Sequence, residues 1–366
     1  MKVLYDSQMF DKQQYGGITR YFANLILGIS KLHHVNADVS VLFSKNYYLQ
    51  AAGKMILNRK LGRMIFSRGK SISKWNKNYS RYRIIKNDFD VFHPTYFHPY
   101  FLKFLKKPFV ITIHDMIYEL YPEYFQTNDH TAENKRKLIE NANHIIAISE
   151  TTKNDLMQIA NVPSEKITVV YHGYKAIKNT NVPQMPLPDS YMLFVGGRDN
   201  YKNFGIFAKA ASEIMRAHPE FKVVCAGGGV FTPEEKKQFE LINIHQDCIY
   251  QIDASDDLLY WLYRGAKVFI YPSLYEGFGL PILEAFEAEC PVVLSETSSF
   301  REVAGPAALY FDPSSYNDLV ECLNRLIIDA QIRKDLISLG TMRLPLFSME
   351  KCLFETLAVY KKCLQN

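Results

Sequence analysis

The first candidates for chemistry are two glutamates on either side of a glycine-containing turn. The segment YEGFGLPILEAF, residues 275–286, contains Glu276 before the turn and Glu284 after it. The apolar run 268–271 predicts a strand before the turn, and Pro281 has the backbone angle that is favoured at the first position of a helix. We therefore expect Glu276 at the carboxyl end of a strand and Glu284 in the first turn of a helix.

The turn itself predicts a phosphate site. Because Gly277 and Gly279 lack a Cβ, their backbone allows N–H groups to approach an anion closely, and the helix N-terminus adds partial positive charge. Both carboxylates also have simpler interpretations, since Glu276 could be a solvated loop residue and Glu284 could complement the helix dipole. Glycine-rich turns between strands and helices are common in α/β proteins, so the spacing alone leaves these alternatives open.

Short apolar runs, with helical stretches between them, recur along the whole chain. Each run is rich in β-branched or aromatic residues and precedes a polar or glycine-containing turn, as is typical of parallel strands in βα units. The runs form two sets of six: 3–5, 39–43, 91–92, 109–113, 145–148 and 167–171, then 192–195, 222–226, 249–252, 268–271, 291–294 and 308–311. We therefore predict an α/β protein with two Rossmann-like, doubly wound domains.

The length of 366 residues and the 48% hydrophobic content favour two domains of ordinary size. The segment 176–190 is proline-rich and has no periodicity, which is typical of a linker. We expect an N-terminal domain at 1–175, a C-terminal domain at 191–345 and a final helix at 346–366 that could cross back to the N-terminal domain. If the two sheets face each other, the carboxyl ends of their strands border a shared cleft, where ligands of such sheets bind.

The positive charge of the chain is concentrated in one segment. Residues 39–87 contain 12 Lys or Arg and no Asp or Glu, whereas the whole chain has a net charge of only +5. Aromatic and aliphatic residues are interleaved with these cations, a composition suited to an anionic membrane surface. The alternative is a solvated face of a helical insertion. Nucleic acid is not an expected partner, because no nucleic-acid-binding motif accompanies the charge.

The chain has no apolar run long enough for a membrane span, and its first ten residues lack the apolar stretch of a signal peptide. We therefore expect a cytoplasmic protein that associates peripherally with the inner face of the cytoplasmic membrane. Its six cysteines contain no C-x-x-C pair, which argues against a zinc site or a disulfide framework. They are expected to be free and mostly buried thiols.

Five segments together resemble family 4 glycosyltransferases, which have the GT-B fold and transfer a sugar from a nucleoside diphosphate. The E-x7-E segment of that family is similar to YPSLYEGFGLPILEAFEAECPVV. The others, in chain order, are YDSQMFDKQQYGGITRYFANL, ITIHDMIYELYPEYF, FVGGRDNYKNF and, after E-x7-E, SSFREVAGPAALYFDP. They span nearly the whole chain in the expected order. Within the family, the sequences of these segments are most similar to those of mannosyl- and rhamnosyltransferases that build bacterial polysaccharides such as the O-antigen of lipopolysaccharide.

The resemblance implies a donor site built from both domains. It assigns donor binding to Gly16, Gly17, Arg198, Lys202, Ile252, Gly277, Phe278, Gly279, Leu280 and Glu284. The resemblance also implies contacts to the base from backbone groups near residues 251–253, which include Ile252. Arg198 and Lys202 match the diphosphate clamp, because a planar guanidinium fork and a point charge can both receive the negative charge of the leaving group. A pair of ordinary surface cations is the simpler alternative for them.

The resemblance also implies roles at the sugar. Glu284 matches the carboxylate that binds two hydroxyls of the ribose, and Glu276 matches a contact to the donor sugar. His114 matches the histidine that contacts the transferred sugar, and Asp115 beside it is a weaker candidate for acceptor contact or loop anchoring. Taken alone, His114 would be interpreted as a strand-end histidine satisfied by hydrogen bonds.

Family membership implies transfer with retention of the anomeric configuration and without a metal or another cofactor. We favour attack on the same face as the leaving group, in which the departing phosphate takes the proton of the acceptor. The D-x-D motif at 88–90 is interpreted as a turn between a helix and a strand and not as a metal site. GDP-mannose is the first-choice donor, followed by GDP-rhamnose and UDP-sugars, and a glycan, lipid-linked in our leading interpretation, is the expected acceptor.

Two other classes of function stay open at this point. One is a different enzyme on a similar scaffold, such as a sugar-nucleotide epimerase or an NAD-dependent dehydrogenase, although CAGGGVF at 225–231 lacks G-x-G-x-x-G. The other is a non-catalytic protein that binds a membrane or a polymer. The intact set of Glu276, Glu284, Arg198 and Lys202 argues against a decayed active site.

Overall fold

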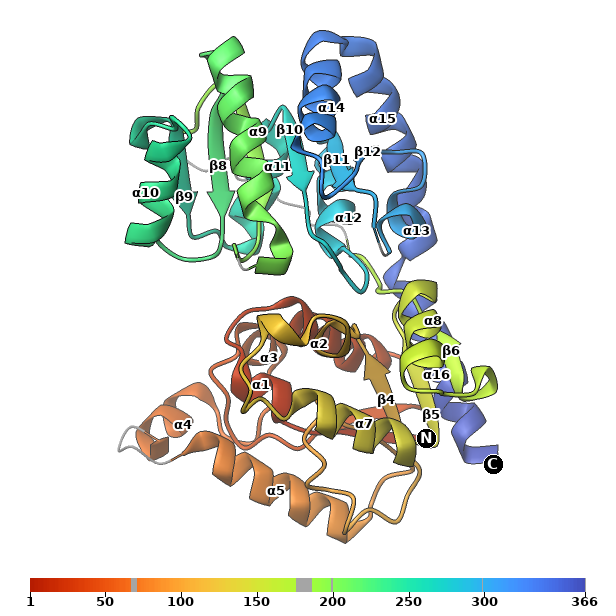
Figure 1. The fold of residues 1–366 in the computed structure, drawn as a ribbon. Helices are drawn as coiled ribbons and strands as arrows, with labels where there is room; N and C mark the ends of the chain where they lie inside the picture. Colours follow the sequence, from red (N-terminus) through yellow and green to blue (C-terminus); the bar gives the residue numbers. More distant parts are fainter. Residues whose placement is uncertain (67–70, 176–185, 199, 298, 366) are drawn as a thin grey trace. The chain divides into compact units, whose positions relative to one another are not determined.

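The structure is a computed structural model that describes the chain except for residues 67–70, 176–185, 199, 298 and 366 (Figure 1). Internal contacts divide it into two compact units, which are Met1–Gly173 with Met349–Asn366 (unit 1) and Tyr174–Ser348 (unit 2). Ten residues of the predicted linker, 176–185, lie outside the described part of the chain.

Unit 1 contains a parallel sheet in two halves. The first half has the order β2-β1-β3 and the second half has the order β4-β5-β6. A parallel bridge between Phe92 and Phe109 joins β3 to the residue before β4. The strands are β1 (Lys2–Tyr5), β2 (Asn36–Val39), β3 (Val91–His93), β4 (Val110–Ile113), β5 (His144–Ala147) and β6 (Ile167–Val169).

Helices connect these strands and cover the sheet. They are α1 (Gln8–Lys12), α2 (Gly17–Ile29), α3 (Tyr47–Ala52), α4 (Arg59–Phe66), α5 (Ile72–Lys86), α6 (Ile117–Leu120), η1 (Pro122–Tyr124), α7 (Thr131–Asn141), α8 (Glu150–Ile159), η2 (Ser164–Lys166) and α16 (Met349–Gln365). The last of these, α16, returns from the end of the chain and joins the core of unit 1, where Leu357 and Tyr360 pack in one cluster with Tyr5.

Unit 2 is a single six-stranded parallel sheet with the order β12-β11-β10-β7-β8-β9. The strands are β7 (Tyr191–Val195), β8 (Lys222–Ala226), β9 (Ile249–Ile252), β10 (Val268–Tyr271), β11 (Val292–Ser295) and β12 (Leu309–Phe311). The helices are η3 (Asn200–Lys202), α9 (Phe204–Ala217), α10 (Pro233–Leu241), η4 (Gln246–Cys248), α11 (Asp256–Gly265), α12 (Leu280–Glu287), α13 (Phe300–Ala304), α14 (Tyr316–Ile328), α15 (Ala330–Arg343) and η5 (Leu344–Phe347).

The burial of the strands explains their sequence pattern. Every residue of β4, β5, β10 and β11 is buried. Strands covered by helices on both faces need apolar residues at every position instead of an alternating pattern. The predicted runs were recognisable for this reason, and the predicted α/β class is confirmed.

One predicted strand is displaced. The run 39–43 was expected to be a strand, but β2 ends at Val39. Val41 and Phe43 are nonetheless buried. The side chain of Asn76 replaces a neighbouring strand there, since its Oδ1 accepts hydrogen bonds from the backbone N–H of Leu42 at 2.9 Å and of Phe43 at 3.3 Å. Apolar composition reports burial, and in this segment burial occurs without strand pairing.

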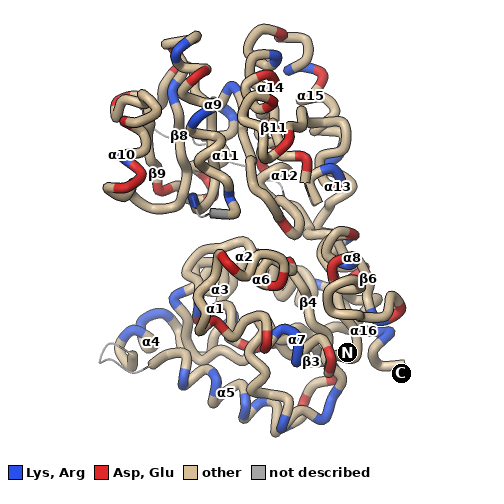
Figure 2. The backbone as a smooth tube through the Cα atoms, in the orientation of Figure 1, with Lys and Arg blue, Asp and Glu red and all other residues tan. Residues whose placement is uncertain are grey.

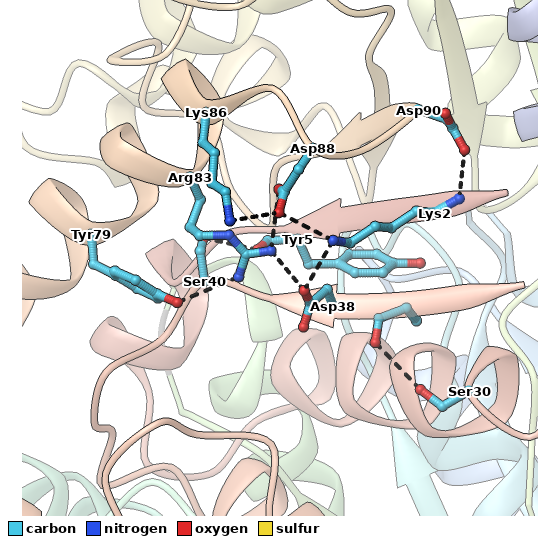
Figure 3. Close-up of polar contacts among 11 residues, drawn as sticks. Lys2, Tyr5, Ser30, Asp38, Ser40, Tyr79, Arg83, Lys86, Asp88 and Asp90 are labelled. Carbon is cyan, nitrogen blue, oxygen red and sulfur yellow. Dashed lines mark hydrogen bonds and ion pairs between the residues drawn. The ribbon is translucent and has the colours of Figure 1, made fainter.

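The D-x-D motif lies between α5 and β3 and is part of an ion-pair network (Figure 3). The carboxylate of Asp88 lies 3.3 Å from Lys2 Nζ, 3.5 Å from Arg83 and 3.4 Å from Lys86 Nζ. Asp90 Oδ2 accepts a hydrogen bond from the backbone N–H of Lys2 at 2.7 Å. Both acidic side chains therefore join the start of β1 to the turn before β3, as a helix-to-strand turn requires.

The basic segment 39–87 includes α3, α4 and α5, and Figure 2 shows Lys and Arg side by side along α4 and α5. Arg83 is turned inward and binds Asp38 Oδ2 at 2.7 Å. Large apolar side chains of the same segment are exposed: Ile56, Leu61, Met64, Ile65, Trp75, Tyr82 and Ile85. Among the described helices, none is both long and apolar enough to cross a bilayer.

Candidate functional site

Two neighbouring strands of unit 2 carry most of the predicted donor residues. The strand order of unit 2 reverses direction between β7 and β10, which makes their carboxyl ends the switch point where doubly wound sheets bind ligands. Lys202 lies in η3, shortly after β7, and Glu276 lies in the loop after β10. The fold thus brings together two charged residues that are separated by 74 positions in the chain.

Lys202 and Glu276 form a short ion pair at this switch point. Lys202 Nζ lies 2.5 Å from Glu276 Oε1, and each side chain is only 15% exposed. Burial alone would lower the pKa of Lys202, but Glu276, Tyr271 and Tyr201 outweigh burial and raise it above its ordinary value. The ammonium is therefore a permanent positive charge in a largely desolvated position, where it can receive the charge of a leaving phosphate.

Hydroxyl side chains after β11 shape the loop that carries Glu276. Ser299 Oγ donates hydrogen bonds to the carbonyl oxygens of Glu276 at 3.0 Å and Phe278 at 2.9 Å. Thr297 Oγ1 donates to the carbonyl oxygen of Leu274 at 2.7 Å. Neither Ser299 nor Thr297 was predicted from the sequence, although both are polar residues shortly after the apolar run 291–294, and polar residues after strands are the signal for such a site.

The glycine turn leads into α12 with a strained backbone that suits glycine. Gly279 is the N-cap with φ 103°, and a Cβ there would lie 2.9 Å from Ile282 Cδ1. The helix begins at Leu280, one residue before the position predicted from Pro281. Gly277, Phe278, Gly279 and Leu280 therefore occupy the approach to a helix N-terminus, where N–H groups attract anions.

Glu284 lies deeper in α12 than the sequence predicted. The first turn of α12 contains no acidic residue, and Glu284 is the fifth helical residue. The prediction that it stands in the first turn is wrong, because the helix begins before Pro281. A dipole interaction is consequently a poor explanation for Glu284, since that effect fades beyond the first turn. Its carboxylate is buried and accepts a hydrogen bond from Tyr263 Oη at 3.3 Å.

Arg198 points toward the segment after β8. Its Nε lies 2.5 Å from Glu235 Oε1, and its NH1 donates to the carbonyl oxygen of Gly227 at 3.0 Å. The side chain is 4% exposed. Its guanidinium is therefore already engaged with protein acceptors, and the diphosphate contact that the resemblance implies for Arg198 stays a prediction.

The segment after β8 also reaches the predicted base contact. Ile252 is the last residue of β9, and its carbonyl oxygen accepts a hydrogen bond from the backbone N–H of Gly227 at 3.1 Å. On the other side, the N–H of Gly196 donates to the carbonyl oxygen of Ala226 at 2.9 Å. The glycines after β8 thus lie between the carboxyl end of β7, which precedes Lys202, and the carboxyl end of β9 at Ile252.

In unit 1, the predicted glycine loop forms a helix start. Gly16 is the N-cap of α2 and Gly17 is its first residue. Thr19 Oγ1 and the backbone N–H of Arg20 both donate to the carbonyl oxygen of Gly16, at 2.9 Å and 3.0 Å. The N–H groups of the first turn lie directly after β1 and α1 and are suited to an anion.

His114 follows β4 and is 6% exposed. Neither of its ring nitrogens has a hydrogen-bond partner among the described residues. Burial, with smaller contributions from the charges of His93 and Lys135, lowers the pKa of His114 to about 3. The imidazole is therefore neutral at physiological pH, and its two nitrogens can exchange hydrogen bonds with sugar hydroxyls without carrying a charge.

Other aromatic residues that the sequence analysis missed surround His114. The ring of His172 is stacked on it at 5.5 Å between centroids and 25° between planes. Tyr21 of α2 contacts His114 edge-on at 5.4 Å and His172 at 4.7 Å. His172 follows the predicted strand 167–171 directly, so its position after a strand was the available signal. These rings fix the plane of the His114 imidazole.

Asp115 anchors the loop after β4 in this structure. Its Oδ1 accepts a hydrogen bond from the backbone N–H of Ile117 at 3.2 Å, and its carbonyl oxygen accepts from Lys135 Nζ at 3.0 Å. Lys135 is fully buried and also binds Glu119 Oε2 at 2.8 Å. These contacts explain how the loop is held, and a contact of Asp115 with the acceptor stays a prediction.

Comparison with known proteins identifies the family of both parts of the chain. Residues 15–176 match the family model described as Glycosyltransferase Family 4, and residues 177–342 match Glycosyl transferases group 1. The O-antigen chain mannosyltransferase B of Escherichia coli is 26% identical over 268 residues, which are 69% of this chain and 70% of that protein. The O-antigen chain mannosyltransferase RfbU of Salmonella typhimurium is 28% identical over 203 residues, 56% of each.

Solved structures agree in fold. Sucrose-phosphate synthase from Thermosynechococcus elongatus superposes with a TM-score of 0.75 at 18% identity, covering 99% of this chain and 98% of that chain. Anabaena HepE in complex with UDP and glucose gives a TM-score of 0.74 at 16% identity, covering 98% and 99%. At these identities the likeness shows the fold. With the two adjacent family models, it establishes that the chain belongs to the family 4 glycosyltransferases and is a glycosyltransferase of the GT-B fold.

Proposed function

We propose that this glycosyltransferase moves a hexose, with mannose as the first choice, from a nucleoside diphosphate sugar to a glycan in bacterial surface polysaccharide synthesis. GDP-mannose is the preferred donor in this proposal, ahead of GDP-rhamnose and UDP-sugars. The names of the two O-antigen mannosyltransferases that the chain resembles support the sugar. The HepE complex supports a nucleotide at this fold in general.

The observation that carries the proposal is the Lys202–Glu276 pair at the switch point of unit 2. Lys202 supplies a buried cation for the diphosphate, and the amides before α12 supply further donors. Glu276 is then positioned to accept hydrogen bonds from the donor sugar. Glu284, which is buried in α12, accepts hydrogen bonds from the two ribose hydroxyls.

We infer that the reaction retains the anomeric configuration and needs no metal. The acceptor oxygen bonds to the anomeric carbon on the face from which the diphosphate departs, the carbon–oxygen bond to the diphosphate breaks, and the acceptor proton passes to a phosphate oxygen. Neutral His114 contributes hydrogen bonds to the sugar and not a proton. An anomeric assignment of the product by NMR and an assay in EDTA check these two statements.

The proposed acceptor is linked to a lipid. The segment 39–87 is the proposed surface by which the protein docks on the inner face of the cytoplasmic membrane. On α4, Met64 is 67% exposed and Leu61 is 44% exposed, while Arg59, Lys60 and Arg63 are exposed on the same short helix. Apolar side chains beside cations suit an interface with anionic lipid.

A binding screen tests the function most economically. Purified chain is titrated calorimetrically with GDP, UDP and ADP, and a Lys202→Met variant serves as the control for the site. We expect GDP to bind most tightly and the variant to lose most of that affinity. Binding of none of the three nucleotides, or binding that Lys202→Met leaves unchanged, would contradict the proposal.

A further inference from the structure

Arg198 lies in a cage of carbonyl oxygens that three consecutive glycines create. Its NH2 donates to the carbonyl oxygens of Gly228 at 3.2 Å and Gly229 at 3.0 Å, in addition to the bond from NH1 to Gly227. The guanidinium carbon also lies 4.7 Å from the ring centre of Phe231. A planar, five-donor cation is suited to a site of this kind, and a lysine could not satisfy it.

The glycines are required by the shape of this cage. Gly227, Gly228 and Gly229 have φ values of 89°, 72° and 71°, a backbone region that other residues rarely adopt. A Cβ on Gly228 would lie 2.4 Å from Arg198 NH1. The segment is therefore folded around the guanidinium, and the two features depend on each other.

Glu235 completes the cage from α10. Its Oε1 accepts from Arg198 Nε at 2.5 Å, and its Oε2 accepts from Arg198 NH2 at 3.2 Å and from the backbone N–H of Thr232 at 2.8 Å. Burial alone would raise the pKa of Glu235, but Arg198 and Thr232 outweigh burial and hold the pKa below its ordinary value. Thr232 and Glu235 also form the capping box of α10, so the Glu235 carboxylate serves both the start of this helix and Arg198.

We propose that Glu235 and Arg198 are positioning residues that hold the Gly227–Val230 loop as a wall of the nucleoside subsite. Gly227 of the loop donates a hydrogen bond to Ile252 at the predicted base position, and Ala226, directly before the loop, accepts one from Gly196. This inference rests on the proposed nucleoside diphosphate donor. It assigns Arg198 to the nucleoside half of the donor and leaves the diphosphate to Lys202 and the amides before α12.

Calorimetric binding of a diphosphate and its monophosphate distinguishes the two roles of Arg198. The full chain is titrated with GDP and GMP, and with UDP and UMP. We expect Glu235→Gln and Arg198→Lys each to weaken the diphosphate and the monophosphate by the same factor, about tenfold, because the subsite they shape holds the nucleoside. Steady-state kinetics should show a higher KM for the donor with little change in kcat.

The opposite pattern would overturn the proposal. If Arg198 binds the diphosphate, Arg198→Lys weakens the diphosphate much more than the monophosphate, and Glu235→Gln tightens diphosphate binding because it frees the guanidinium. Glu289→Gln is the matched control, since it removes a carboxylate that pairs with Arg264 on an exposed part of unit 2. This control should leave all four affinities unchanged.

Amide hydrogen exchange tests the loop without any ligand. Glu235→Gln should accelerate exchange at least several-fold in a peptide covering 227–232, while a peptide covering β7 keeps its protection. Unchanged exchange in 227–232 would refute the proposal even if nucleotides bind. Failure of the wild-type chain to bind any nucleotide would instead refute the proposed function, and the exchange result would still decide whether the pair holds the loop.

Discussion

At the scale of residues, the proposed donor site is defined by which charges are buried and what they contact. Lys202 and Glu276 satisfy each other in a poorly solvated position, so removing one partner leaves the other charge uncompensated. His114 is the contrasting case, because it is buried, neutral and without a hydrogen-bond partner among the described residues. The ion pair can act on a diphosphate, and the imidazole can act on hydroxyls.

The two glutamates are expected to separate binding from transfer. Glu284→Gln should weaken nucleotide binding about tenfold, because a charge-assisted pair of hydrogen bonds to the ribose is lost. Glu276→Gln should keep nucleotide affinity within about threefold of the wild type and reduce transfer by at least about a hundredfold. Calorimetry with the nucleotide and a transfer assay measure the two effects, and equal losses of nucleotide affinity in both variants would contradict this division.

Asp11 gives a pH-dependent stability with a defined sign. Burial is the main cause that raises the pKa of Asp11 to about 6, although Asn76 and Ser7 donate hydrogen bonds to it. Because the folded state keeps the proton more strongly than the unfolded chain, this carboxyl makes the protein less stable as pH rises from about 4 to 6. Asp11→Asn should therefore raise the midpoint of thermal unfolding at pH 7.5, and the gain should shrink at pH 4.5.

Asp129→Asn is the control for that measurement. Hydrogen bonding from Thr131 is the main cause of the lowered pKa of Asp129. The negative charge of Asp129 therefore stabilises the folded state at pH values above the ordinary pKa of a carboxyl group. This variant should not gain stability at pH 7.5. A constant effect of Asp11→Asn across pH 4.5 to 7.5 would contradict the assignment.

The residue types at the site could be predicted better than their partners. His114 stands directly after a strand, Lys202 and Glu276 lie in the segments that follow strands, and these positions are visible in the sequence. The pairing of Arg198 with Glu235 was not predictable, because it depends on the side-chain direction and on a loop that closes around it. The stacking of His172 on His114 depends in the same way on the packing of two strand ends.

At the scale of elements, side chains after β11 position the loop that follows β10, and the last helix, α16, packs into the core of unit 1. Ser299 and Thr297 fix the loop that carries Glu276. In unit 1, Tyr360 of α16 bonds to Tyr5 of β1 at 2.8 Å and to His93 of β3 at 2.6 Å between polar atoms. This buried contact ties the end of the chain to the central strands.

Tyr360→Phe tests that contact. Removal of the hydroxyl leaves Tyr5 and His93 with buried polar atoms that lose a partner, which costs about 1–3 kcal/mol of unfolding free energy. Thermal or denaturant unfolding measures the loss, and nucleotide affinity should stay unchanged because Tyr5 and His93, the two partners of Tyr360 named above, are not predicted donor residues. Tyr316→Phe, at an exposed position of α14, is the control and should have little effect. Equal stability of the two variants would contradict the role of α16.

At the scale of the whole molecule, the apolar runs predicted the α/β class, the parallel strands and the alternation of strands and helices in both units. The exception at 39–43 shows the limit, since a buried segment there obtains its hydrogen bonds from Asn76 instead of a strand. The start of α12 was also misplaced, because Pro281 occupies the second helical position and not the first. Composition reports burial and turns, while pairing depends on contacts that are distant in the chain.

The basic segment predicts how the whole molecule behaves at a membrane. Charge reversal of Arg59, Lys60 and Arg63 to Glu should reduce cosedimentation with vesicles containing anionic lipid by at least about tenfold, since each cation contributes roughly 1 kcal/mol near such a surface. Reversal of Lys209, Lys237 and Lys334, which are exposed on unit 2, is the matched control. Equal binding of both triple variants would identify 39–87 as a solvated surface.

A crystal structure of the full chain with GDP or UDP bound would show directly where the diphosphate of the donor binds. We expect the diphosphate oxygens within hydrogen-bond distance of Lys202 Nζ and of the backbone N–H groups that precede α12, with the ribose hydroxyls on Glu284. A diphosphate bound elsewhere, with the Lys202–Glu276 pair untouched by the ligand, would contradict the proposed role of Lys202 in binding the diphosphate.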